Sequence, residues 1–151
     1  MNTLELYWIR KDELAGSNRP NTEKDIKKIL KEKIKRIVSV SRSEFIENLL
    51  KNADIKQLKL EFHDFGTPSK DQALIFLKFA KEAKLLKEPL LIHCAAGCGR
   101  TGLLLCLYLM NFENLSYLDA LNDIRKVRSC AVETKEQEIF LKSFNKNEYN
   151  V

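Results

Sequence analysis

The stretch H93-C94-A95-A96-G97-C98-G99-R100-T101-G102 decides how this chain folds, because it joins two segments of different character. The apolar run 89–93 before it is typical of a buried strand, and the segment 99–112 after it has the length and composition of a helix. A loop that enters a helix presents backbone N–H groups at the positive end of the helix dipole. Gly97 and Gly99 allow the unusual dihedral angles of a tightly wrapped loop. The stretch therefore predicts a phosphate-binding loop at the carboxyl end of a strand.

The same loop carries side chains suited to phosphoryl transfer. Cys94 lies at its base, where N–H groups that hold a phosphate dianion also stabilise a thiolate, the nucleophilic form of cysteine. The planar guanidinium of Arg100 can bind two phosphate oxygens and follow them as the transferring group flattens. Thr101 adds a hydroxyl within reach of the thiolate. These residues predict an enzyme whose nucleophile is Cys94.

Outward from this loop, strand-like and helix-like segments alternate along the chain. Short apolar or β-branched runs predict strands at 4–9, 34–40, 55–62 and 89–93. Helical spacing and capping residues such as Thr22 and Ser69 predict helices at 22–33, 43–51, 69–87, 99–112, 116–128 and 134–144. This order predicts an α/β three-layer sandwich, with a mostly parallel central sheet of four to five strands flanked by helices.

Length and composition bound the class of protein. The chain has 151 residues, 44% hydrophobic and 31% charged, which predicts a single folded domain over 1–151. Its longest apolar run, 103–110, is far shorter than the roughly 20 residues of a membrane-spanning helix. The N-terminus has neither a basic leader nor a small-residue cleavage site. We therefore expect a cytoplasmic monomer that makes no contact with membranes.

The cysteines and the net charge limit which cofactors and partners can be expected. The cysteines at 94, 98, 106 and 130 are predicted to be thiols, because nothing indicates secretion and their spacing matches no zinc site. Cys106 lies among leucines and is predicted to be a core residue. The net charge of +5 favours anionic partners. The lysines alternate with glutamates, however, as on solvated helix faces, so nucleic acid is only weakly indicated.

The pattern H-C-x5-R-T resembles the signature of the cysteine-dependent protein tyrosine and dual-specificity phosphatases, especially their small archaeal-type and dual-specificity members. The resemblance implies that Cys94 forms a phosphocysteine, that Arg100 binds the phosphoryl oxygens, and that Thr101 stabilises the departing thiolate. It implies that His93 supports the loop. It assigns phosphate binding to the loop residues Ala95, Ala96, Gly97, Cys98, Gly99 and Arg100, with no metal or cofactor.

Two segments outside the signature extend the resemblance. H63-D64-F65-G66-T67-P68-S69 is similar to the mobile segment that carries the family's general acid, which implies that Asp64 protonates the leaving oxygen. V127-R128-S129-C130-A131-V132-E133-T134-K135-E136-Q137 is similar to the segment whose glutamine positions the hydrolytic water, which implies that role for Gln137. Ser129 and Cys130 replace the usual Pro-Gly, which puts the local turn in doubt.

Several alternatives remain open at this point. Cys98 is either a tolerated loop residue or a thiol that traps oxidised Cys94 as a disulfide. The expected substrates are proteins or peptides that carry phosphotyrosine, with phosphoserine and phosphothreonine also accepted. Phosphoinositides are disfavoured, because lipid phosphatases of the superfamily often carry lysines in the loop where this chain has Ala95, Ala96 and Cys98. The alternatives are an RNA 5′-phosphatase, which fits the basic chain, and a non-catalytic phosphoprotein-binding module.

Overall fold

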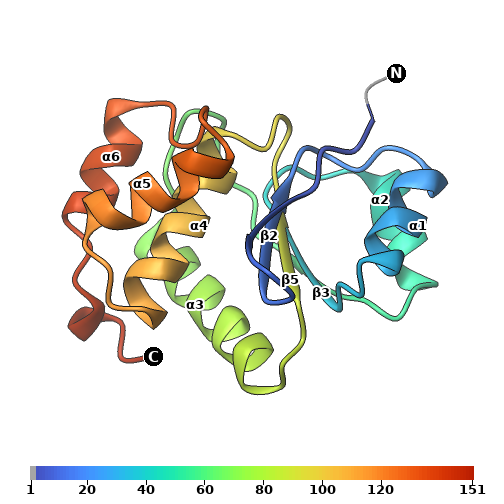
Figure 1. The fold of residues 1–151 in the computed structure, drawn as a ribbon, viewed down its shortest axis with the longest axis horizontal. Coiled ribbons are helices and arrows are strands. Elements are labelled where there is room, and N and C mark those ends of the chain that lie inside the picture. The colour runs from blue at the N-terminus through green and yellow to red at the C-terminus, as the bar shows by residue number, and fades with distance from the viewer. Residues whose placement is uncertain (1–2) are drawn as a thin grey trace.

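The computed structural model describes residues 3–151 and shows an α/β sandwich with helices on both faces of one sheet (Figure 1). The strands are β1 (Tyr7–Arg10), β2 (Leu14–Ser17), β3 (Arg36–Ser39), β4 (Lys56–Lys59) and β5 (Leu90–His93). They lie in the order β1-β2-β5-β3-β4. Only β1 runs antiparallel to its neighbour, and the other pairs are parallel. The predicted fold is confirmed.

Six α-helices form the two outer layers. One face of the sheet is covered by α1 (Glu23–Lys31) and α2 (Glu44–Lys51), and the other by α3 (Lys70–Leu85), α4 (Gly99–Phe112), α5 (Tyr117–Val127) and α6 (Lys135–Lys142) (Figure 1). A 3₁₀ turn, η1 (Lys146–Glu148), follows near the C-terminus. Leu90 and Ile92 of β5 pack into the larger core and Leu91 into the smaller one. The central strand thus buries both faces, as parallel strands do.

Helix α4 is the centre of the larger layer. All its residues from Gly99 to Asn111 are buried, as expected for a helix that is apolar on every side. It packs close to the segment before α6: a Cβ atom on Gly102 would come within 2.7 Å of the Val132 nitrogen. Cys106 is fully buried in it, which confirms the predicted core position, and burial raises the pKa of this thiol to about 12. Because α4 is buried along almost its whole length, the position of the loop at its N-terminus is fixed.

The sequence patterns did not predict β2, and they predicted the other four strands to be longer than they are. β2 has the sequence LAGS, which is short and contains a glycine, so it shows no strand periodicity. A Cβ atom on Gly16 would lie 2.5 Å from the Tyr7 hydroxyl, so this glycine makes room for the side chain of the neighbouring strand. The caps were predicted correctly: Thr22 and Ser69 each close a capping box.

None of the helices among residues 3–151 has the length and apolar character needed to cross a membrane.

Candidate active site

The loop between β5 and α4 is held from outside through its carbonyl oxygens. The three donor–acceptor pairs are Arg19 N to Ala95 O at 3.1 Å, Arg128 Nη2 to Ala96 O at 2.8 Å and Tyr7 Oη to Gly97 O at 2.7 Å. Each donor comes from a different part of the chain. Successive carbonyls that face outward leave the inner side of the loop to its N–H groups, which is the arrangement of an anion-binding nest.

Gly97 has the backbone conformation that the sequence predicted for this loop. Its φ angle is +74°, in the left-handed region that favours glycine. A Cβ atom here would also lie 2.6 Å from the backbone carbon of Ser17. Any side chain at position 97 would therefore push the loop away from the end of β2.

Cys94 lies directly after β5 as a free thiol and is only 3% exposed. Its neighbour His93 is buried, and His93 Nε2 lies 2.7 Å from Ser39 Oγ at the end of β3. The same hydroxyl accepts a hydrogen bond from Gln57 Nε2 at 2.9 Å. Burial lowers the pKa of His93 to about 4. His93 is therefore neutral at pH 7 and ties the base of the loop to the sheet, in keeping with a supporting role.

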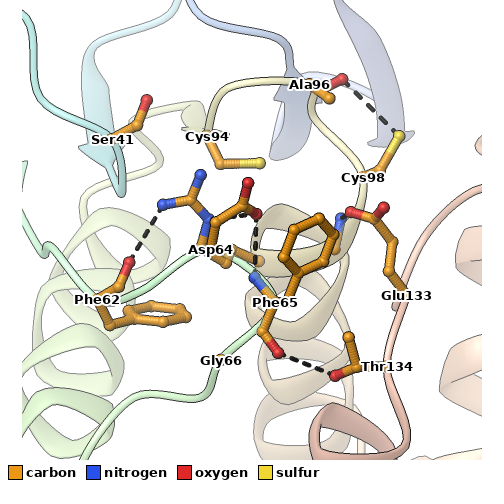
Figure 2. A network of polar contacts seen from close by, with 12 residues as sticks. Ser41, Phe62, Asp64, Phe65, Gly66, Cys94, Ala96, Cys98, Glu133 and Thr134 are labelled. Atoms are coloured by element: carbon orange, nitrogen blue, oxygen red, sulfur yellow. Dashed lines mark hydrogen bonds and ion pairs between the residues drawn. The ribbon is translucent and has the colours of Figure 1, made fainter.

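Arg100 and Asp64 meet at the mouth of the loop. Arg100 lies in the first turn of α4 and is 7% exposed; its Nη1 donates to Phe62 O at 3.1 Å. Its Nε lies 3.5 Å from Asp64 Oδ1, the oxygen that also accepts the Phe65 N–H at 3.0 Å. Figure 2 shows the carboxyl group of Asp64 pointing toward Cys94. The structure thus brings Asp64 to the loop that carries Cys94 and Arg100.

The segment that carries Asp64 is tied to the N-terminus of α6. Thr134 Oγ1 donates to Phe65 O at 3.0 Å, as Figure 2 shows, and Gln137 Nε2 donates to Gly66 O at 3.1 Å. Gln137 Oε1 accepts the Glu133 N–H at 2.8 Å, so both ends of this amide are engaged. Gln137 therefore positions the segment that carries Asp64 in this structure, and its contact with a water molecule stays a prediction.

Two features of the first turn of α4 bear on phosphate binding. The Thr101 hydroxyl is buried and has no hydrogen-bond partner within residues 3–151, which leaves it free for a group that enters the site. Glu133 Oε1 accepts the Gly99 N–H at 2.8 Å. A phosphate that uses this N–H has to displace the Glu133 carboxylate, because both are anions that need the same donor.

The prediction of four thiols is wrong for two of them. Cys98 forms a disulfide with Cys130, 32 residues away, and their Cα atoms are 5.2 Å apart. The doubtful turn at Ser129 and Cys130 is present, with the Ala131 N–H donating to Arg128 O at 3.0 Å, and it brings Cys130 to the loop. In this structure Cys98 is bonded to Cys130 and Cys94 is a free thiol, so Cys98 does not pair with Cys94 here. The expected cell compartment carries no information on which cysteine side chains lie in contact, so it could not predict this disulfide.

A cavity of about 860 Å³ opens beside these residues. Its lining comes from the ends of β2, β3 and β4, the Asp64 segment and the start of α3, and it includes Arg19, Ser41, Arg42, Glu61, His63, Asp64, Gln72 and Arg100. Arg19 was not predicted as a site residue, because β2 was not predicted, and the contacts of Tyr7 and Glu133 with the loop were not predicted either. The only available signal for Arg19 was its place directly before Pro20, where a loop leaves a strand.

Comparison with known families agrees with this geometry. The family model described as "Swiss Army Knife protein, DSP-PTPase phosphatase domain" matches residues 3–141. Human tyrosine-protein phosphatase non-receptor type 20 is 37% identical over 90 residues, a match that covers 55% of this chain and 21% of that protein. Mouse dual specificity protein phosphatase 22 is 35% identical over 85 residues, covering 54% of this chain and 46% of that protein. The chain thus spans less than half the length of these relatives.

Solved structures extend the likeness over nearly the whole chain. The crystal structure of Tk-PTP in the active form has a TM-score of 0.84 at 28% identity, covering 91% of this chain and 93% of that one. PTPMT1 has a TM-score of 0.83 at 22% identity, with 97% of this chain and 96% of that one covered, which shows a shared fold. The signature H-C-x5-R-T, the sandwich around it and the match over residues 3–141 agree. The chain therefore belongs to the family of cysteine-dependent tyrosine and dual-specificity phosphatases.

Proposed function

We propose that this chain is a protein phosphatase that hydrolyses phosphotyrosine, and also phosphoserine and phosphothreonine, through a phosphocysteine intermediate. The observation that carries the proposal is the meeting of the Cys94 thiol, the Arg100 guanidinium and the Asp64 carboxyl at one loop. These are a nucleophile, a fork for phosphate oxygens and a proton donor, the three groups that phosphoryl transfer to cysteine needs.

In the first step the Cys94 thiolate attacks phosphorus and the bond to the leaving oxygen breaks. Asp64 gives its proton to that oxygen, so that an alcohol or phenol leaves and Asp64 becomes a carboxylate. Arg100 and the loop N–H groups bind the three equatorial oxygens, whose charge is greatest in the transition state. To do this, Arg100 exchanges its contact with Asp64 for the phosphate.

In the second step a water molecule attacks the phosphocysteine, and the sulfur–phosphorus bond breaks. The Asp64 carboxylate accepts a proton from the water, which restores the acid for the next turnover. Cys94 leaves as a thiolate, and the unpartnered hydroxyl of Thr101 is suited to stabilise it. Gln137 takes part through the Asp64 segment, which it holds by Gly66 O.

The exposed wall of the cavity supports more than one phosphorylated side chain as substrate. The segment 61–69 forms one wall, and Asp64 on it is 55% exposed, so the phosphate is reached from an open cleft and not through a narrow tube. A short phosphoserine needs such an open approach, and a longer phosphotyrosine tolerates it.

The test is an assay of the purified protein against phosphotyrosine, phosphoserine and phosphothreonine peptides and against RNA with a 5′-triphosphate. We expect peptide turnover that a chelator does not change, and acid quenching should trap a covalent phosphoryl group on wild-type protein by mass spectrometry. The variant Cys94→Ser should bind phosphopeptide without turnover, and Cys130→Ser in reductant serves as the matched control. Faster turnover of the RNA would support the RNA 5′-phosphatase instead, and robust turnover by Cys94→Ser would exclude the mechanism.

A further inference from the structure

Arg19 is a second guanidinium in the cavity of the candidate active site that the proposed chemistry does not use. It follows β2 and is half-buried, and its backbone N–H holds Ala95 O of the loop at 3.1 Å. Its side chain is aimed by one hydrogen bond, from Nε to Ser41 Oγ at 2.9 Å. Ser41 also lines this cavity. Because this hydrogen bond engages Nε, the N–H donors of the two Nη groups point away from Ser41 and can bind another group.

The three arginines that line this cavity differ in what neutralises them. Arg100 pairs with Asp64, and Arg42 Nε lies 3.0 Å from Glu47 and 3.9 Å from Glu61. Arg19 forms no ion pair with any carboxylate in residues 3–151. A half-buried arginine without a counter-charge beside a phosphate loop is a binding group for an anion that arrives with the substrate.

The positive charges of Arg19 and Arg100 both act on His93, at the base of the loop. Both guanidinium groups disfavour protonation of the buried His93, after the larger effect of burial itself. The Arg19 backbone also contacts the loop at Ala95 O, and its side chain lines the same cavity as Arg100, so a substrate held by Arg100 brings its neighbouring groups toward Arg19.

We propose that Arg19 binds the carboxylate of an acidic residue next to the phosphorylated residue, which makes it a specificity-determining residue of this cleft. The inference rests on the proposed function. A single carboxylate fits better than a densely charged headgroup, because Arg42 is already paired and Glu61 adds a negative charge to the same cavity. The loop positions Ala95, Ala96 and Cys98 supply no further cation.

The test compares two phosphotyrosine peptides that differ only in Glu or Gln next to the phosphorylated residue. For wild-type protein we expect kcat/KM to be about tenfold higher for the Glu peptide, the size of one charge-assisted hydrogen-bonded pair. The ratio should fall toward one in Arg19→Gln and be intermediate in Arg19→Lys, which keeps the charge and loses the fork. It should also fall as salt is added, since the site is open to solvent. The matched variant Arg42→Gln, in the same cleft, should keep the ratio.

The outcomes separate the inference from the function on which it rests. If wild-type protein hydrolyses both peptides equally, the Arg19 proposal is wrong and the phosphatase stands. If it hydrolyses neither peptide, the proposed function itself fails. An equal loss of the ratio in Arg42→Gln would remove the assignment to Arg19. Strong turnover of phosphoinositide vesicles that depends on Arg19, with no ratio between the peptides, would replace the acidic peptide by a lipid.

Discussion

Removal of the Cys98–Cys130 disulfide should lower the free energy of unfolding by about 3 to 4 kcal/mol. The sequence separation is 32, and the entropy of closing a loop of that length in the unfolded chain gives this value at 25 °C. Cys130 is exposed, so replacing its sulfur by a hydroxyl should cost little beyond the loss of the cross-link. Cys130→Ser therefore isolates the cross-link better than Cys98→Ser, which also changes the phosphate loop.

The assay is urea unfolding at pH 7, with and without a reductant that reaches the exposed sulfur. Without reductant, Cys130→Ser should unfold at a clearly lower urea concentration than wild-type protein, and with reductant the two curves should coincide. The double variant Cys98→Ser/Cys130→Ser should be no less stable than the less stable single variant, because either change alone breaks the bond. A wild-type curve that reductant does not move, or additive losses in the double variant, would refute the cross-link as a source of stability.

Three further results are expected. Arg100→Lys should lose at least about a hundredfold in kcat/KM, since the charge stays and the two-oxygen fork is lost, and steady-state kinetics on a phosphopeptide measures it. Asp64→Asn should slow phosphocysteine formation by about 10²- to 10⁴-fold for phosphotyrosine but far less for an aryl phosphate with an acidic phenol, and rapid-quench rates on both substrates check the ratio. His93 has a pKa lowered to about 4, so the unfolded chain binds a proton there between about pH 6.5 and 4 that the folded chain does not. Its share of stability, about 3 kcal/mol, is present above pH 6.5 and lost as pH falls to 4, so His93→Asn should show a flatter pH dependence of the free energy of unfolding than wild-type protein.

The fold was largely predictable because most of its elements carry their own local signals. Helix α1 begins at a Thr-x-x-Asp box, and β5 is a run of apolar residues that ends at the loop. β2 carries no such signal: its residues are buried by β1 and β5, and its glycine exists to fit Tyr7. A strand that forms only because of its neighbours in the sheet can be identified only when the positions of those neighbours are known.

The candidate site likewise contains residues that carry a local sequence signal and residues that do not. The loop from Cys94 to Arg100 is contiguous, so a single short motif indicated the nucleophile, the anion nest and the fork. Asp64 lies 30 residues earlier and was found by likeness of its flanking residues, and the structure places it at Arg100. The Cys98–Cys130 bond was not predicted, because it depends on where the turn after α5 comes to rest.

The groups that shape the phosphate loop come from segments with no motif of their own. Tyr7, Arg19 and Arg128 each hold one loop carbonyl, and Glu133 holds the Gly99 N–H. These residues lie between 32 and 90 positions along the chain from the groups they contact. A change in the side chain of Tyr7, Arg128 or Glu133 alters the orientation of peptide groups in the loop without touching a reacting atom, whereas the Arg19 contact is made by the backbone and survives a change of side chain. Loss of rate in such a variant therefore measures preorganisation of the anion site, and its size should follow the number of loop contacts removed.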